Sequence, residues 1–360
     1  MTIKDRIINA AVEIRMEDAS EIIFQHSIFA QVALPRSKPE GRVWERNFKN
    51  ASVVVEAGRI FNGRKLVEQP LPYGTKPRLA LIHINSEAVR TQCPQIEVGH
   101  SVAEFLRRMG LADQDGRTYQ SFKKQMMALA ASRLTIGFNK NGKAVTINTQ
   151  PVSKFEAWLV NNDRQEALWP GELTLSTEYF ESLIEHAVPL DLRAISALSH
   201  SALALDIYTF LARRLHEMER PVKVPFVSFQ EQFGQEYSNY QNFKKKFLEA
   251  MKQVQAVYPA AKIQQVTGGL VLNPSHPPVK TIAKGHRIGR EAIKALPSPN
   301  PTGNLTERTL ERFRALWAGL DVYACKDDFD QWLSDKEQKP VDYNRAFFGF
   351  AKKWTKGKVC

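Results

Sequence analysis

The stretch Tyr119-Gln-Ser-Phe-Lys-Lys124 occurs a second time in this chain of 360 residues, as Tyr240-Gln-Asn-Phe-Lys-Lys245, with five of the six positions identical. The sequence before each copy also matches, at a separation of 124 residues: Leu79-Ala-Leu81 with Leu203-Ala-Leu205, Phe105 with Phe229, and Gly110 with Gly234. A repeat of this length indicates a duplicated domain, because the units of solenoid proteins span only about 20 to 50 residues.

Both copies of the motif lie in a predicted amphipathic helix, over residues 118–132 in the first copy and 239–255 in the second. Apolar side chains recur at helical spacing and define one face of each helix: Tyr119, Phe122, Met126 and Leu129, then Tyr240, Phe243, Phe247, Ala250 and Val254. The two tyrosines are therefore expected in a core or between domains, rather than stacked on bases. Lysine and glutamine occupy the opposite face of each helix.

The elements around these helices follow the same order in both copies. The first copy predicts helices over 78–90 and 101–109, a strand at 96–98, and strands at 134–138 and 143–147 around Asn141-Gly142, a strong hairpin signal. The second predicts helices over 194–218 and 226–233, and strands around Gly268-Gly269. Helix, short helix, basic helix and hairpin is the order of a winged-helix domain, whose third helix enters the DNA major groove.

The expected fold class is α+β, with two tandem winged-helix domains, an N-terminal helix and hairpin extension, and a small C-terminal helical module. The extension, residues 1–69, combines a helix over 3–24 with a hairpin of 52–56 and 65–67, and should pack on the first winged helix. The other predicted boundaries are 70–168 and 169–279 for the winged helices, 280–303 for a basic, proline-rich linker, and 304–360 for the module and a basic tail. Three short helices with their own aromatic core are expected in the module.

The net charge of +12 is concentrated near the two motif helices. From Arg117 to Lys143 there are six basic residues and no acidic one; from Tyr240 to Lys262 there are five basic residues and one acidic residue. Solvated surfaces usually mix both signs, so these stretches indicate a polyanionic partner, namely duplex DNA. A single basic helix face is as often merely solubilising, and it is the recurrence at the same position that favours DNA contact.

The outward residues divide by the chemistry of DNA recognition. Glutamine and asparagine pair with adenine and lysine pairs with guanine, so the predicted base contacts are Gln120, Lys124, Gln241, Asn242 and Lys245. Other basic residues of the helices and hairpins would contact phosphates: Arg117, Lys123, Arg133, Lys140, Lys143, Lys244, Lys252 and Lys262. Asn239, at the start of the second helix, completes the predicted DNA-binding set.

The sequence carries none of the sharp signatures of an enzyme. It contains no phosphate-binding loop of the form G-x-x-x-x-G-K-[ST]. His83-Ile84-Asn85 stops one residue short of the paired histidines expected in a metal-assisted tyrosine nickase. We therefore expect no catalytic residue, no cofactor and no enzymatic activity.

Metal sites and membrane spans are not expected either. Cys93, Cys325 and Cys360 lack the spacing of a zinc site or a disulfide framework, and the acids of Asp327-Asp328-Phe329-Asp330 would point to different sides of a helix. No apolar stretch approaches the roughly 18 residues of a membrane span. The first 20 residues mix acids with bases, unlike a signal peptide, so a cytoplasmic protein is expected.

Three stretches carry a resemblance to a known family: Leu71-Pro-Tyr-Gly-Thr-Lys-Pro-Arg-Leu-Ala-Leu-Ile-His-Ile-Asn-Ser-Glu-Ala-Val-Arg-Thr91, Val102-Ala-Glu-Phe-Leu-Arg-Arg-Met-Gly-Leu111, and residues 125–134. Together they resemble the plasmid-encoded RepA replication initiators of Gram-negative bacteria, over roughly residues 25–275. The resemblance implies two winged helices that bind the repeated sites, or iterons, of a plasmid origin. It also implies a monomer that opens the origin, a homodimer that represses its own promoter, and recruitment of the host replication initiator and the replicative helicase.

Two alternative functions stay open at this point. One is a transcriptional repressor of the same fold that binds DNA without opening it. The other is a nicking or priming enzyme, which the missing catalytic motifs disfavour.

Overall fold

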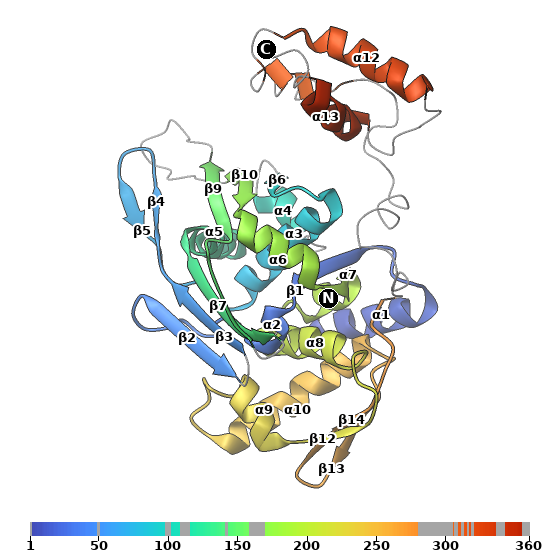
Figure 1. Cartoon of the computed structure of the whole chain (residues 1–360). Coiled ribbons are helices and arrows are strands. Elements are labelled where there is room, and N and C mark those ends of the chain that lie inside the picture. The colour runs from blue at the N-terminus through green and yellow to red at the C-terminus, as the bar shows by residue number, and fades with distance from the viewer. Residues whose placement is uncertain are drawn as a thin grey trace. The chain divides into compact units, whose positions relative to one another are not determined.

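The computed structural model describes residues 2–48, 51–97, 102–108, 116–140, 143–157, 170–279, 305, 309–310, 313–314, 317, 320–335 and 343–354. The chain divides into two compact units, Met1–Ala283 and Lys284–Cys360. Helices and strands both contribute substantially, as expected for an α+β protein (Figure 1). Each unit is described by itself.

The second repeat is built from three helices and a three-stranded antiparallel sheet. Its elements are α8 (Ala202–Arg214), β12 (Val222–Pro225), α9 (Phe226–Phe233), α10 (Tyr240–Val257), β13 (Ile263–Val266) and β14 (Gly269–Leu272), and the strand order is β12-β14-β13. Phe229, Phe243 and Phe247 pack together between α9 and α10. Gly269 is required where β14 meets β12, because a Cβ there would lie 2.2 Å from the Val224 carbonyl oxygen.

The first repeat has the same arrangement, with one insertion. Its elements are α3 (Thr75–Thr91), β6 (Gln95–Glu97), α4 (Val102–Arg108), α5 (Gly116–Ala131), β7 (Arg133–Lys140), β8 (Lys143–Thr149), β9 (Val152–Ala157) and β10 (Pro170–Leu175). The strand order β6-β10-β9 matches β12-β14-β13 of the second repeat. The pair β9–β10 is therefore the counterpart of β13–β14, and the β7–β8 hairpin is inserted before it.

This insertion corrects the predicted position of the first repeat's terminal hairpin. The strands around Asn141-Gly142 do form a hairpin, but it joins a four-stranded sheet of order β2-β3-β7-β8 with β2 (Val43–Phe48) and β3 (Ala51–Glu56). Six residue pairs, from Ala51↔Phe138 to Glu56↔Arg133, connect β3 to β7. A turn signal identifies the two strands it joins, but the neighbouring strand is set by tertiary contacts.

The N-terminal segment also differs from its prediction. The first helix, α1 (Ile3–Met16), ends eight residues early, and β1 (Ile22–His26) pairs antiparallel with β11 (Ala187–Asp191). Isoleucine and phenylalanine in β1 fit a helical spacing, but they also favour strands once a partner strand is present. The hairpin around Asn62-Gly63 is formed by β4 (Arg59–Phe61) and β5 (Leu66–Glu68), and β3 is not part of it.

The extension packs on both repeats rather than on the first alone. Helix α1 contacts α10 and α7 (Leu192–Leu198), and α2 (Ile28–Gln31) contacts α8. The predicted helix over 194–218 is two helices, α7 and α8, because the Ser201 hydroxyl caps α8 by accepting from the Ala204 amide at 3.2 Å. The remaining helix, α6 (Thr177–His186), lies between the repeats along the chain.

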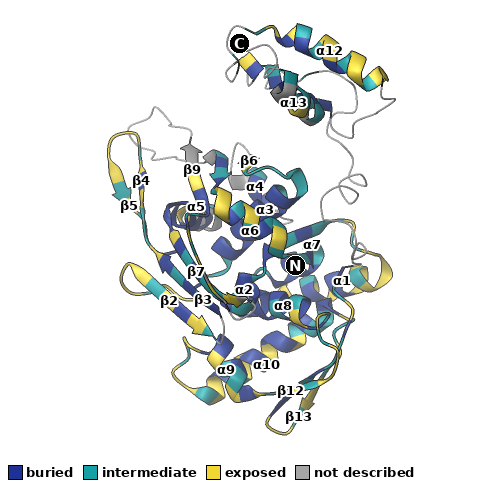
Figure 2. Cartoon of the chain, in the orientation of Figure 1, coloured by how far each residue is buried: buried dark blue, intermediate teal, exposed yellow. Residues whose placement is uncertain are grey.

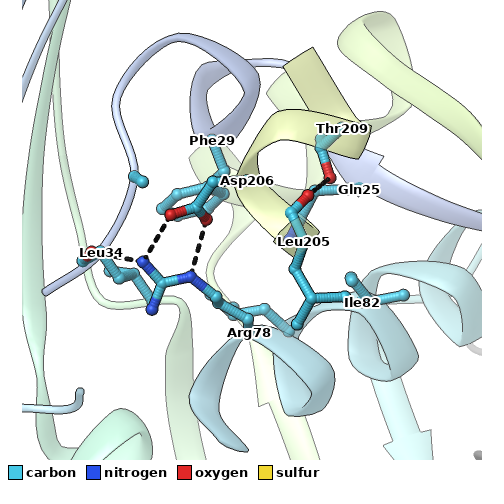
Figure 3. A pocket seen from close by; sticks show the side chains of 10 residues that line it. Gln25, Phe29, Leu34, Arg78, Ile82, Leu205, Asp206 and Thr209 are labelled. Carbon is cyan, nitrogen blue, oxygen red and sulfur yellow. Dashed lines mark hydrogen bonds and ion pairs between the residues drawn. The ribbon is translucent and has the colours of Figure 1, made fainter. Parts of the chain in front are cut away.

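A buried ion pair joins the first helices of the two repeats, α3 and α8. Arg78 Nε and Nη2 donate to the two Asp206 oxygens at 2.7 and 3.0 Å, and both side chains are about 95% buried (Figure 3). The remaining N–H groups of Arg78 donate to the carbonyl oxygens of Leu34, Pro35 and Gly74. The cavity beside the pair measures only about 10 Å³. A bidentate pair with every guanidinium donor satisfied fixes the two helices together.

The C-terminal unit has its own core. Its described helices include α12 (Val322–Asp335) and α13 (Tyr343–Trp354), and its buried side chains are Phe313, Val322, Cys325, Phe329, Tyr343, Phe347 and Ala351. Asp328 accepts from Trp354 Nε1 at 2.5 Å, and Asp330 accepts from Lys326 and Tyr343, so both carboxylates are bound within this unit. The buried aromatic side chains Phe313, Phe329 and Phe347 pack against one another in this core.

Candidate nucleic-acid interface

One of the predicted DNA-binding residues, Asn239, caps the N-terminus of helix α10 with its side chain. Asn239 Oδ1 accepts from the backbone amides of Gln241 and Asn242, at 2.7 and 3.1 Å. This bond satisfies donors that every helix leaves unpaired at its N-terminus. The side-chain oxygen of Asn239 is thus engaged in capping the helix. The residue is exposed, so its side-chain NH₂ group is the part that a ligand can contact.

The outward face of α10 carries polar and basic side chains. Gln241, Asn242, Lys245 and Lys252 are exposed, whereas Phe243, Phe247 and Val254 are fully buried on the opposite face (Figure 2). Lys244 is half-buried, and its Nζ lies 4.8 Å from the centre of the Phe226 ring. A cation over an aromatic face is attracted to it. Lys244 therefore contacts α9 and is less available to a ligand than Lys245.

The electrostatics of α10 are dominated by its lysines. Lys246 Nζ and Glu249 Oε2 are 3.0 Å apart, and this hydrogen bond, with the nearby charges of Lys245 and Lys252, lowers the pKa of Glu249. The carboxylate stays ionised, yet it pairs with one lysine only. An exposed net positive surface remains on this helix, as a phosphate backbone requires.

Helix α5 presents a similar but smaller surface. Gln120 and Lys124 are exposed, Lys123 is half-buried, and Arg117 is described only by its backbone. Lys76, in the first turn of α3, donates to the Ser121 hydroxyl at 2.7 Å and adds a positive charge beside this face. The conserved spacing of the motif thus brings Gln120 and Lys124 to the position that Gln241 and Lys245 occupy in α10.

The tyrosines of the repeated motif are not positioned as stacking platforms. Tyr119 and Tyr240 are half-buried and pack against the apolar core. The interpretation of these residues as core rather than base-stacking groups is consistent with this packing.

The hairpin residues of the predicted set are spread over two kinds of structure. Arg133 is exposed at the start of β7, and Lys140 and Lys143 pair across the turn of the inserted hairpin, where only their backbone is described. Lys262 is exposed immediately before β13, at the end of that strand opposite the Thr267-Gly268 turn. The structure therefore does not bring these four residues together at equivalent hairpin tips.

The exposed residues near the second hairpin's turn were missed by the sequence interpretation. Gln264, Gln265 and Thr267 are exposed on β13 and its turn, and Gly268 has a φ of +81°, which glycine tolerates. These side chains are uncharged, so a search for basic residues passes over them. The corresponding turn of the first repeat, between β9 and β10, lies outside the described residues.

A clamp from the N-terminal extension positions the turn before α10. Glu236 accepts from the amides of Arg36 and Ser37 at 2.8 and 2.7 Å and from the Ser37 hydroxyl at 2.5 Å, while Arg36 donates to the Phe233 carbonyl. Burial raises the pKa of Glu236, but the hydrogen bonds from Ser37 and Arg36 outweigh burial and lower the pKa below 4.5. Nothing in the local sequence indicates a partner 199 residues away.

Part of the chain matches a known protein family. Residues 71–226 match the family model described as plasmid encoded RepA protein. This region is similar to the plasmid-encoded RepA family. The RepA region contains α3, α5 and α8, and it ends at the first residue of α9, so α10 follows it. The match supports a role in the initiation of replication.

Two solved structures resemble the chain at a distance. A selenomethionine derivative of domains 2 and 3 of RctB has a TM-score of 0.46 and 9% identity, over 71% of this chain and 99% of that one. A second structure of RctB domains 2–3 gives 0.42 and 9%, over 68% and 93%. No curated protein matches the sequence.

Two further observations concern sites of other kinds. None of the helices in the described part of the chain is long and apolar enough to cross a membrane. Among the same residues, no group of three or more histidine, cysteine, aspartate or glutamate side chains is arranged to bind a metal ion.

Proposed function

We propose that this protein initiates plasmid replication by binding repeated origin sites in duplex DNA through two tandem winged helices. The observation that carries the proposal is the equivalence of α5 and α10. Each precedes a sheet of the same strand order and exposes a glutamine and a lysine from the same motif, Gln120 and Lys124 or Gln241 and Lys245. A helix held in this way by a small sheet is the usual major-groove element of winged-helix proteins.

The proposed division of labour follows from the exposed chemistry. Gln241, Asn242 and Lys245 contact base edges, and Lys252 contacts the backbone, with Gln120 and Lys124 in the equivalent roles in the first repeat. Binding through six to ten phosphates would make the affinity fall steeply with salt, with a slope of log affinity against log salt of roughly −5 to −9.

The test is a footprint on the origin of the native plasmid. The wild-type chain should protect a series of repeated sites, and Lys245→Glu with Lys252→Glu should abolish protection because both side chains are exposed and basic. The same charge change at Lys4 and Arg15, exposed on α1, is the matched control and should leave protection intact. An affinity that does not change between 50 and 200 mM salt would contradict the proposal.

Origin opening and recruitment of the host initiator and helicase belong to the same proposal and rest on the family match. Permanganate reactivity of a supercoiled origin plasmid distinguishes an initiator, which opens the duplex, from a repressor of the same fold, which binds without opening it. A homodimer that represses the protein's own promoter would appear as a second, palindromic protected site.

We also propose that no catalytic step is involved. Incubation with origin DNA and Mg²⁺ should yield neither a covalent tyrosyl adduct nor primers. Either product would establish the nicking or priming alternative.

A further inference from the structure

The β4–β5 hairpin exposes large apolar side chains at its end. Phe61 and Leu66 form a cross-strand pair and are 59% and 61% exposed. Among the described strands, β4 and β5 pair only with each other. The hairpin extends away from β3, and most of its residues are exposed (Figures 1 and 2). Ile60, which faces the other way, is buried in the core and anchors the hairpin at its base.

The turn of this hairpin has a defined shape. Asn62 Oδ1 accepts from the amides of Arg64 and Lys65 at 3.1 and 2.9 Å, and Gly63 has a φ of +93°. The turn therefore holds Arg64 and Lys65, both exposed, directly beside the apolar pair. A rigid turn loses little entropy when it binds a partner.

The charge of the hairpin is positive. Glu68, its acidic residue, is shared by Arg42 and Arg59, each at 2.9 Å, and these two guanidinium groups lower the pKa of Glu68. Arg64 and Lys65 add two further positive charges at the turn. The hairpin itself thus has three bases against one acid, and Arg42, just before β2, adds a fourth positive charge beside it. This excess of positive charge fits a polyanionic partner.

The hairpin also lies next to one of the proposed recognition helices. Strand β4 contacts α5, and a Cβ on Gly58, just before β4, would lie 1.9 Å from the Ala131 carbonyl oxygen at the end of α5. The backbone of the hairpin thus meets the C-terminal end of α5 without space for a side chain. A duplex that contacts α5 would therefore pass close to the point where the hairpin meets this helix.

We propose that the β4–β5 hairpin is an additional DNA-contacting arm, in which Arg64 and Lys65 bind backbone phosphates and Phe61 and Leu66 press into the adjoining minor groove. This inference rests on the proposed function, because it needs the duplex that α5 and α10 bind. Apolar wedges of phenylalanine and leucine are used by minor-groove proteins to unstack a base step. Such a wedge would help an initiator to distort its origin.

The test uses a duplex that carries the plasmid's repeats, with 2-aminopurine placed at successive steps. Wild-type protein should raise the 2-aminopurine fluorescence at one step beside each α5 footprint, and Phe61→Ala with Leu66→Ala should remove this rise while leaving affinity within about threefold. Arg64→Glu with Lys65→Glu should weaken binding about tenfold or more and flatten the salt slope by about 2.

Matched controls separate these effects from a general loss of apolar surface or charge. Ile8→Ala with Val12→Ala removes comparably exposed apolar groups from α1, 50% and 48% exposed, and Lys4→Glu with Arg15→Glu makes the same charge change. Both controls should behave as wild type. In addition, p-benzoylphenylalanine in place of Phe61 should cross-link to DNA, and in place of Val12 it should not.

The outcomes distinguish the two proposals. If wild-type protein protects the repeats but the hairpin variants match it in fluorescence and affinity, and the photoreactive residue in place of Phe61 does not cross-link to DNA, the proposal of a DNA-contacting arm is wrong and the proposed function stands. If wild-type protein does not bind the repeats at all, the proposed function is wrong and the arm is wrong with it.

Discussion

The second repeat passes from α10, which ends at Val257, to β13, which begins at Ile263, whereas the first repeat places the whole β7–β8 hairpin between α5 and β9. Both nevertheless close a sheet of the same order. The inserted hairpin is accommodated because it pairs with β3 of the N-terminal extension and so forms a separate sheet. The two repeats therefore share the helix and the three-stranded sheet that supports it. The segment between this helix and the sheet differs, and in the first repeat it pairs with a strand outside the repeat.

The junction between the repeats is expected to give the largest effect. Asp206→Ala leaves the Arg78 guanidinium buried without its carboxylate, and such a loss typically costs about 3 to 5 kcal/mol. Urea unfolding should show this decrease. The double change Asp206→Leu with Arg78→Met removes both charges and should recover most of the stability; a loss below 1 kcal/mol for Asp206→Ala alone would show that the pair does not hold α3 and α8 together.

The equivalence of α5 and α10 can be tested by one substitution in each. Lys124→Glu and Lys245→Glu should each weaken binding to the origin repeats by about 10- to 100-fold, because each replaces an attraction to DNA by a repulsion. Footprints should show that the two substitutions remove protection from different halves of each repeated DNA site. If only Lys245→Glu has an effect, the first repeat does not bind DNA through α5.

The β13–β14 hairpin of the second repeat and the inserted β7–β8 hairpin are expected to contribute differently to DNA binding. Gln264→Ala with Gln265→Ala, on the hairpin that closes the second sheet, should weaken origin binding about three- to tenfold. Lys140→Glu with Lys143→Glu, on the inserted hairpin, should change it less than threefold, despite the larger change in charge. Fluorescence anisotropy on one duplex measures both. The reverse ranking would show that the inserted hairpin, and not the β13–β14 hairpin of the second repeat, contacts DNA.

A smaller effect is expected at the clamp before α10, which has no described counterpart before α5. Glu236→Gln should lower the free energy of unfolding by about 1 kcal/mol, since charge-assisted hydrogen bonds become neutral ones. The pKa of Glu236 is lowered in the folded protein, so its contribution to stability is full above the ordinary glutamate pKa of 4.5 and is lost as pH falls through the lowered pKa. The difference between variant and wild type should therefore shrink below pH 4.5, and a difference that is the same at pH 3 and pH 7 would rule out the carboxylate as its source.

Local patterns predicted most elements of the repeats, because the information lies within a few residues. The apolar stripe of α10 and the predicted helix 226–233 agree with the structure, and the latter has the same bounds as α9. The predictions were wrong where one stretch of sequence is compatible with both a helix and a strand. Ile22 and Phe24 suit a helix or a strand, and pairing with β11 decided for the strand.

Periodicity and charge are local properties of the chain, so the residues alone were enough to predict a duplicated basic helix that buries the same apolar positions in both copies. The sequence also supplied the motif resemblance that the family match over residues 71–226 supports. Three features became visible only in the folded chain: the hairpin that closes each sheet, the contact of Lys244 with Phe226, and the bonds by which Glu236 joins the extension to the turn before α10. These features depend on contacts between residues far apart in the chain, and such contacts leave no local pattern.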